Sequence, residues 1–124
     1  MHFSAGAGVC LEALRSGIAS YRAHVFDASF KVRHTVPLAG PPSRTRVSRD
    51  GRLAAFTVFV NGHSYSSPGF TTRTSVIDTA SGRLVVEDLE ALTVLKEGAP
   101  FKAADFNFWG FTFAHDVNRF YATL

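Results

Sequence analysis

Residues that would indicate disulfide cross-links or a membrane span are scarce in this chain. It has one cysteine, Cys10, in 124 residues, so an internal disulfide is excluded and the redox compartment stays open. No apolar run approaches the roughly 20 residues of a membrane-spanning helix, and no membrane span is expected. Residues 1–16 include Glu12 and Arg15 and lack the continuous apolar stretch of a signal peptide. Localisation is therefore left open between the cytoplasm and export by a signal outside this sequence.

Concentrated charge is also missing. Charged residues make up 19% of the chain, and the formal net charge is +3. Proteins that bind nucleic acid usually gather their basic residues in a stripe, whereas only Arg44, Arg46, Arg49 and Arg52 cluster in this chain. No nucleic-acid partner is therefore expected. Arg44 and Arg46 would share one face of a strand, where a solvated surface is favoured over a basic patch.

Helical periodicity is absent from every segment of 11 or more residues, and the composition favours strands and turns. The chain has 12 phenylalanines and 10 glycines against one methionine. Apolar or alternating runs bounded by turn residues recur along it, as in β-strands. Strands are predicted over residues 9–14, 21–27, 31–36, 44–48, 53–60, 72–78, 84–88, 108–113 and 119–124. The sequence therefore predicts an all-β fold.

One stretch of sequence occurs twice. Residues 47–57 match residues 113–123 without gaps: an apolar residue, a small residue, a turn led by Asp, and an apolar run that ends in Thr. Repetition of this kind is typical of modular folds. Asp50 and Gly51 lie between two apolar runs, which predicts a hairpin because the turn needs a positive φ. In the second copy Asp116 leads the turn, and Asn118 is expected to adopt the left-handed conformation.

The predicted strands group into one complete unit and two partial ones. Residues 43–89 hold four strands joined in order, which is the meander of a propeller blade. Residues 1–38 would supply the last three strands of a preceding blade, and residues 106–124 the first two strands of a third. The expected architecture is a partial, open β-propeller of about two blades, and a small β-sandwich is the alternative. The residues assigned to structural turns are Asp27, Asp50, Gly51, Asp78, Gly82, Asp116 and Asn118.

Residues 48–57 and 74–82 together resemble the repeat of TolB-like (WD40-like) β-propellers. In that family a Ser-Pro-Asp-Gly turn precedes an apolar strand, and a later strand ends in Asp before a Gly turn. Arg49 occupies the position where the family usually has proline. In the second copy, Val117 occupies the position where the family usually has glycine. The resemblance implies a non-catalytic scaffold that binds a protein or small ligand, often in the bacterial cell envelope, without a cofactor. Because an incomplete ring exposes blade edges, self-association is also expected.

The loop after residues 53–60 supplies the candidate contact residues His63 and Tyr65. Residues 62–66 also resemble the nucleophile elbow of α/β-hydrolases, which would make Ser64 a nucleophile served by His115 and by Asp78 or Asp105. Ser66 replaces the second glycine of that motif, and strand-like sequence follows where a helix should begin. A polar loop without catalytic residues is therefore the favoured interpretation.

Aromatic residues gather near the C-terminus. Strand alternation would place Trp109, Phe111 and Phe113 on one face and Phe108, Gly110 and Thr112 on the other. An exposed face of this kind stacks on sugars or bases, which makes Trp109 a candidate binding residue, although a blade core is favoured.

Two histidines flank the first predicted hairpin. His24 and His34 would be cross-strand neighbours able to share a metal ion. Because a third ligand is missing, two hydrogen-bonded histidines are favoured and no metal site is expected.

Overall fold

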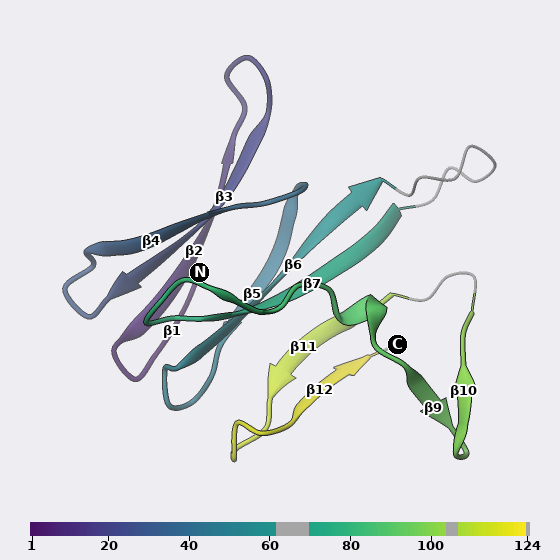
Figure 1. The fold of residues 1–124 in the computed structure, drawn as a ribbon. Helices are drawn as coiled ribbons and strands as arrows, with labels where there is room; N and C mark the ends of the chain where they lie inside the picture. The colour runs from purple at the N-terminus through teal and green to yellow at the C-terminus, as the bar shows by residue number, and fades with distance from the viewer. Residues whose placement is uncertain (62–69, 104–106, 124) are drawn as a thin grey trace.

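The computed structural model describes residues 1–61, 70–103 and 107–123. Regular structure in these residues is β apart from a single 3-10 turn, η1 (Leu89–Ala91), which confirms the predicted fold class. Two four-stranded antiparallel sheets and two hairpins follow one another along the chain (Figure 1). None of the described residues belongs to a helix with the length and hydrophobicity needed to cross a bilayer.

The first sheet has four strands in the order β1-β2-β3-β4, where the sequence predicted three. The additional strand is β1, and it pairs with β2 through a two-residue turn at Ala5 (φ 47°) and Gly6 (φ 84°). An alanine with positive φ is an uncommon turn residue, so the local sequence gave little indication of this hairpin. The strands are β1 (His2–Ser4), β2 (Ala7–Leu14), β3 (Ser20–Asp27) and β4 (Val32–Pro37).

The second sheet is the four-stranded antiparallel meander expected within residues 43–89, in the order β5-β6-β7-β8. Its last strand is short and pairs with only the C-terminal end of β7, so no strand among the described residues lies along the outer edge of residues 70–75. The strands are β5 (Pro42–Val47), β6 (Leu53–Asn61), β7 (Phe70–Asp78) and β8 (Leu84–Val86).

Two hairpins complete the described chain. The hairpin of β9 (Val94–Lys96) and β10 (Ala99–Phe101), which the sequence did not predict, turns at Glu97 (φ 53°) and Gly98 (φ 81°). The hairpin of β11 (Trp109–Phe113) and β12 (Phe120–Thr123) is the one expected at the C-terminal repeat.

Alternation along β6 divides the core into two clusters on opposite faces of the second sheet. Ala54, Phe56 and Val58 pack with Val9 and Val25 of the first sheet. The residue between Ala54 and Phe56 on β6 points to the other face. The buried residues on that face are Ala55, Val76, Leu89, Phe108 and Phe111. The second sheet is therefore a middle layer, with the first sheet on one side and η1 and β11–β12 on the other (Figure 1).

The first strands of the three successive layers lie near one another. Both β1 and β11 contact β5. The turns that follow β1 and β5 also meet, because Ser4 Oγ donates to the carbonyl of Arg49 at 3.2 Å. Gly51 lies so close that a Cβ there would be 2.9 Å from the carbonyl oxygen of Ala5. The first two sheets thus meet at their turns as well as face to face.

Candidate functional site

The repeated sequence forms a turn with the same backbone hydrogen bonds in both copies. Between β5 and β6, the N–H of Ser48 donates to the carbonyl of Leu53 at 2.8 Å, and that of Gly51 to the carbonyl of Ser48 at 2.9 Å. In the second copy, the corresponding bonds run from Ala114 to Arg119 at 2.8 Å and from Val117 to Ala114 at 3.1 Å. The repeat is therefore a repeat of turn geometry.

The carboxylate of each turn bonds within its own loop. Asp50 Oδ1 accepts from the N–H of Arg52 at 3.1 Å, and Asp116 Oδ1 accepts from the N–H of Asn118 at 3.2 Å. The Ser48 hydroxyl, followed by the Arg52 N–H, holds the pKa of Asp50 below its usual value. The prediction about the left-handed residue was wrong: Val117 has the positive φ of 62°, at the position of Gly51, and Asn118 does not.

Asp27 and Asp78 end the third strands of the two sheets, and each begins a turn, the turn after Asp78 being one residue longer. Asp27 Oδ1 accepts from the N–H of Ser29 at 2.9 Å, and Asp78 Oδ1 from the N–H of Ser81 at 2.8 Å. The N–H and hydroxyl of Ser81 lower the pKa of Asp78. Gly82 has a φ of 70° and lies against the ring of His34, so the turn after Asp78 contacts β4 of the first sheet. Each of these carboxylates bonds within its own turn, and Asp27 also accepts from Arg33 Nε on β4 at 2.6 Å.

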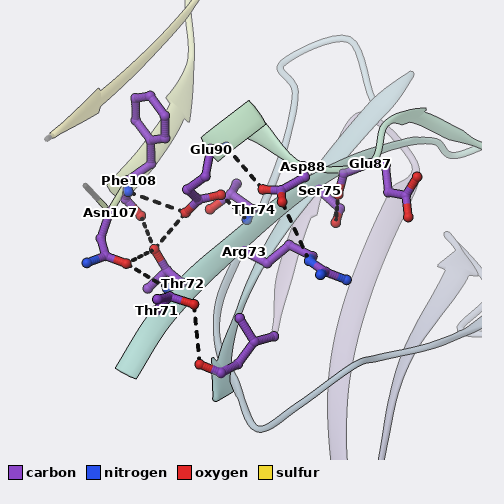
Figure 2. Close-up of polar contacts among 11 residues, drawn as sticks. Thr71, Thr72, Arg73, Thr74, Ser75, Glu87, Asp88, Glu90, Asn107 and Phe108 are labelled. Atoms are coloured by element: carbon purple, nitrogen blue, oxygen red, sulfur yellow. Dashed lines mark hydrogen bonds and ion pairs between the residues drawn. The ribbon is translucent and has the colours of Figure 1, made fainter. Parts of the chain in front are cut away.

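A cluster of polar side chains covers the open edge of β7 (Figure 2). Glu90, on η1, accepts the Thr72 hydroxyl at 2.7 Å and the N–H of Thr74 at 3.2 Å. Asn107 Oδ1 accepts the N–H of Thr72 at 2.8 Å. The N–H of Phe108 also donates to Glu90, at 3.4 Å. These side chains take the place of the strand that β8 is too short to supply, which protects the edge.

The carboxyl of Glu90 is half-buried in this cluster. Burial, followed by its interaction with Asp88, raises the pKa of Glu90 above its usual value. Arg73 lies nearby, with Nε 3.8 Å from Asp88 Oδ2, which is too far for a hydrogen bond. Within the described chain, Arg73 Nε is buried without a hydrogen-bond partner. Sequence reasoning missed this cluster because its members lie on separate segments and form no local motif.

Trp109 does not share a face with Phe111 and Phe113, so that prediction was wrong. The pairing shifts by one residue between Trp109, opposite Thr123, and Thr112, opposite Tyr121. The positive φ of Gly110, 63°, marks the bulge that adds the extra residue. Trp109 consequently remains 44% exposed, whereas Phe111 is 3% exposed.

The exposed tryptophan is nonetheless anchored. Its ring lies 5.9 Å from that of Phe59, centroid to centroid, at 53°. On the neighbouring strand β12, Tyr121 lies on the same face of the hairpin as Trp109 and is 61% exposed. An aromatic surface therefore exists at this end of the molecule, made of Trp109 and Tyr121.

His24 and His34 lie on opposite faces of the first sheet and do not form a pair. A one-residue bulge in β3–β4 places His24 opposite Thr35 and His34 opposite Val25. His24 Nε2 bonds Glu12 at 2.9 Å, and His34 Nε2 donates to the carbonyl of Ala80 at 2.8 Å. Among the described residues, no group of three or more His, Cys, Asp or Glu side chains is placed to hold a metal ion.

Several candidates fall where the structure gives no description. His63, Tyr65 and Ser64 lie in residues 62–69, and Asp105 lies in residues 104–106, all outside the described residues. The binding role of the first two and the nucleophile role of Ser64 therefore stay predictions.

A hollow of about 580 Å³ opens between β2 and β5. Leu11 and Ala13 line it from β2, and Arg44 and Arg46 from the start of β5. Its basic side chains are the two arginines that the sequence placed on one strand face.

Comparison of the chain with models of known families, with curated proteins and with solved structures gives no match.

Proposed function

We propose that this chain is part of a TolB-like β-propeller and acts as a non-catalytic scaffold that binds a protein or small ligand. The observation that carries the proposal is the stacking of three successive β units, face to face and in chain order, with their first strands adjacent. A β-sandwich needs two packed sheets, whereas a propeller repeats the same packing step from blade to blade.

Equivalent positions of the first two sheets support the same proposal. Aligning Asp27 with Asp78 brings Val25 to Val76 and Phe26 to Ile77. Val25 packs toward the second sheet, and Val76 packs toward the third layer. Ile77 packs toward the first sheet, and Phe26 stacks on Phe3 on the other face of the first sheet, which no other described layer covers. Each residue therefore faces the same way along the stack as its counterpart, as a repeating blade requires.

The two ends of the stack carry exposed aromatic surface. On the first sheet, Phe26 is stacked between Phe3, 48% exposed, and Phe30, 74% exposed. At the other end, Tyr121 of β12 is 61% exposed, and Trp109, 44% exposed, lies against Phe59 of the second sheet. Apolar faces of this kind favour association, so the chain by itself would self-associate through its end faces. The resemblance to TolB-like proteins favours an exported, cell-envelope parent, with His63 and Tyr65 as loop contacts.

Light scattering coupled to gel filtration tests the scaffold proposal. The wild-type chain is expected to form concentration-dependent oligomers, and Phe30→Asp and Tyr121→Asp are each expected to shift it toward the monomer. Ile18→Asp is the matched control, because Ile18 is 94% exposed but lies in the β2–β3 connection, away from both end faces. A wild-type monomer at all concentrations, with cooperative unfolding, would indicate a self-contained β-sandwich. Labelling of Ser64 by a fluorophosphonate probe would refute the absence of catalysis.

A second candidate function rests on the exposed aromatic surface. Trp109 and Tyr121 would stack on a sugar or a base, and stacking of this kind contributes about 1–3 kcal/mol per base. Trp109 is the one tryptophan of the chain, so its fluorescence reports on this surface alone. A change of emission on adding oligosaccharide or oligonucleotide, lost in Tyr121→Ala, would support this candidate, and an unchanged spectrum would count against it.

A further inference from the structure

The hollow between β2 and β5 contains cations without matching anions. Arg44 and Arg46 alternate on β5 and line the hollow together. Within the described residues, neither arginine forms an ion pair with a carboxylate. The acidic residue of β2, Glu12, lies between Leu11 and Ala13 on the strand and therefore points to the opposite face, where it pairs with His24. Arg46 Nη1 donates to the backbone carbonyl of Thr45 at 3.0 Å. The hollow thus has two guanidinium groups, and none of its described lining residues is acidic.

The edge of β5 adds hydrogen-bond donors on the same side. β5 is the edge strand of its sheet, and the N–H of Val47 points away from β6 to His2 Nδ1 at 2.9 Å. Because N–H groups of alternate residues point the same way in an antiparallel strand, the N–H of Thr45 is directed toward this open edge as well. The hydroxyl of Ser43 also lines the hollow.

His2 lies at one end of this strand edge. Burial, followed by the charge of Arg46, lowers the pKa of His2, and its Nδ1 is already an acceptor for Val47. The imidazole of His2 therefore closes one end of the strand edge, and the arginines supply the charge. Leu11, Ala13 and Pro42 supply an apolar part of the wall, and the rest of the lining comes from Met1, Ser43 and Thr45.

From this arrangement we infer that the hollow binds a small organic phosphate, with the phosphate held by Arg44 and Arg46 and the organic part against the apolar wall. Guanidinium groups match the geometry of phosphate oxygens and bind them with charge-assisted hydrogen bonds. The volume of about 580 Å³ accommodates a small metabolite rather than a polymer. The site lies between two strands of one chain, so it does not depend on the propeller proposal.

Titration calorimetry with phenyl phosphate tests the inference, with inorganic phosphate and succinate as comparison probes. We expect phenyl phosphate to bind with a Kd below about 1 mM, more tightly than inorganic phosphate because of the apolar wall. Arg44→Gln and Arg46→Gln should each weaken binding at least about tenfold, and rising NaCl should weaken it in the wild type. Arg83→Gln removes an exposed arginine that does not line the hollow, so it should bind like the wild type.

Amide NMR identifies the site independently of affinity. Phenyl phosphate should shift the amide signal of Thr45, and this shift should disappear in Arg44→Gln while the rest of the spectrum stays folded. The inference is overturned if phenyl phosphate does not bind, if the arginine variants bind it as well as Arg83→Gln does, or if succinate binds equally tightly. Failure of the propeller proposal would instead appear in the oligomeric state, which none of these measurements reads.

Discussion

Val117 occupies in the C-terminal turn the position that Gly51 occupies in the turn between β5 and β6. Their φ angles are 62° and 75°, and both donate their N–H to the residue three positions earlier. Glycine adopts this conformation freely, whereas a β-branched side chain is strained by it. The second copy of the repeat therefore keeps the turn geometry without the residue that favours it.

Val117→Gly is expected to stabilise the protein by about 1 kcal/mol, because it removes the left-handed strain. The increase should appear as a higher midpoint of urea unfolding with an unchanged slope. The reverse change, Gly51→Val, should destabilise more strongly, since its Cβ would also press on the carbonyl oxygen of Ala5. A loss of stability in Val117→Gly would show that the valine side chain contributes packing that outweighs the strain.

Glu90→Ala should reduce the free energy of unfolding by about 1–3 kcal/mol, because it leaves the buried donors of Thr72 and Thr74 without their acceptor. Chemical denaturation measures this change, and hydrogen exchange should show faster exchange at Thr74. Glu87→Ala is the control, because Glu87 is exposed and only its backbone carbonyl is used, by Ser75. Equal effects of the two variants would argue against the edge-protecting role of Glu90.

Acid should destabilise the fold through its turn aspartates. The folded-state pKa values of Asp27, Asp50 and Asp78 are lowered, so their contribution is full above the unfolded value, about pH 4, and is lost as the pH falls through the folded values. Asp50→Asn keeps an acceptor oxygen but cannot titrate, so its stability should fall less steeply below about pH 4. An unchanged slope in thermal unfolding at several acidic pH values would exclude Asp50 as a contributor.

Glu90 acts in the opposite direction, because its folded-state pKa is raised. As the pH rises from the pKa of Glu90 in the unfolded state to its pKa in the folded state, ionisation of Glu90 lowers the free energy of unfolding. In Glu90→Ala, the free energy of unfolding should therefore no longer show this decrease as the pH rises.

Gly40→Ala should destabilise the protein by about 3 kcal/mol or more, because the new methyl group would overlap the backbone carbonyl of Phe59. Gly17→Ala is a useful comparison: Gly17 has a φ of 75° but nothing within 4 Å of the added Cβ. That variant should lose only about 1 kcal/mol from backbone strain. The two unfolding midpoints, measured side by side, separate steric overlap from strain, and equal losses would contradict the close approach of Gly40 to β6.

Local chemistry was enough to predict the fold class and the main strands. The turns led by Asp27, Asp50, Asp78 and Asp116 have their own side-chain acceptors and lie between apolar runs, so a few neighbouring residues determine them. The two strands that frame Asp50-Gly51 were expected for the same reason. By contrast β1 was missed, because its turn uses Ala5 with a positive φ that is uncommon for alanine.

Side-chain neighbours that depend on register could not be predicted in this way. A bulge of one residue moves every side chain beyond it to the other face. This is why Trp109 separates from Phe111, and why His34 faces away from His24. Strand periodicity alone does not predict such an insertion.

The sequence by itself thus determined an all-β chain, a repeated turn and the sharing of one strand face by Arg44 and Arg46. Only the tertiary structure decided that the second sheet is a middle layer, that Glu90 replaces a missing strand at the edge of β7, and that the two arginines line a hollow without a carboxylate. The physical reason is how far apart in the sequence the interacting residues are. Turns and strand alternation depend on residues a few positions apart, whereas layers, edges and hollows are made by segments that meet only after the chain has folded.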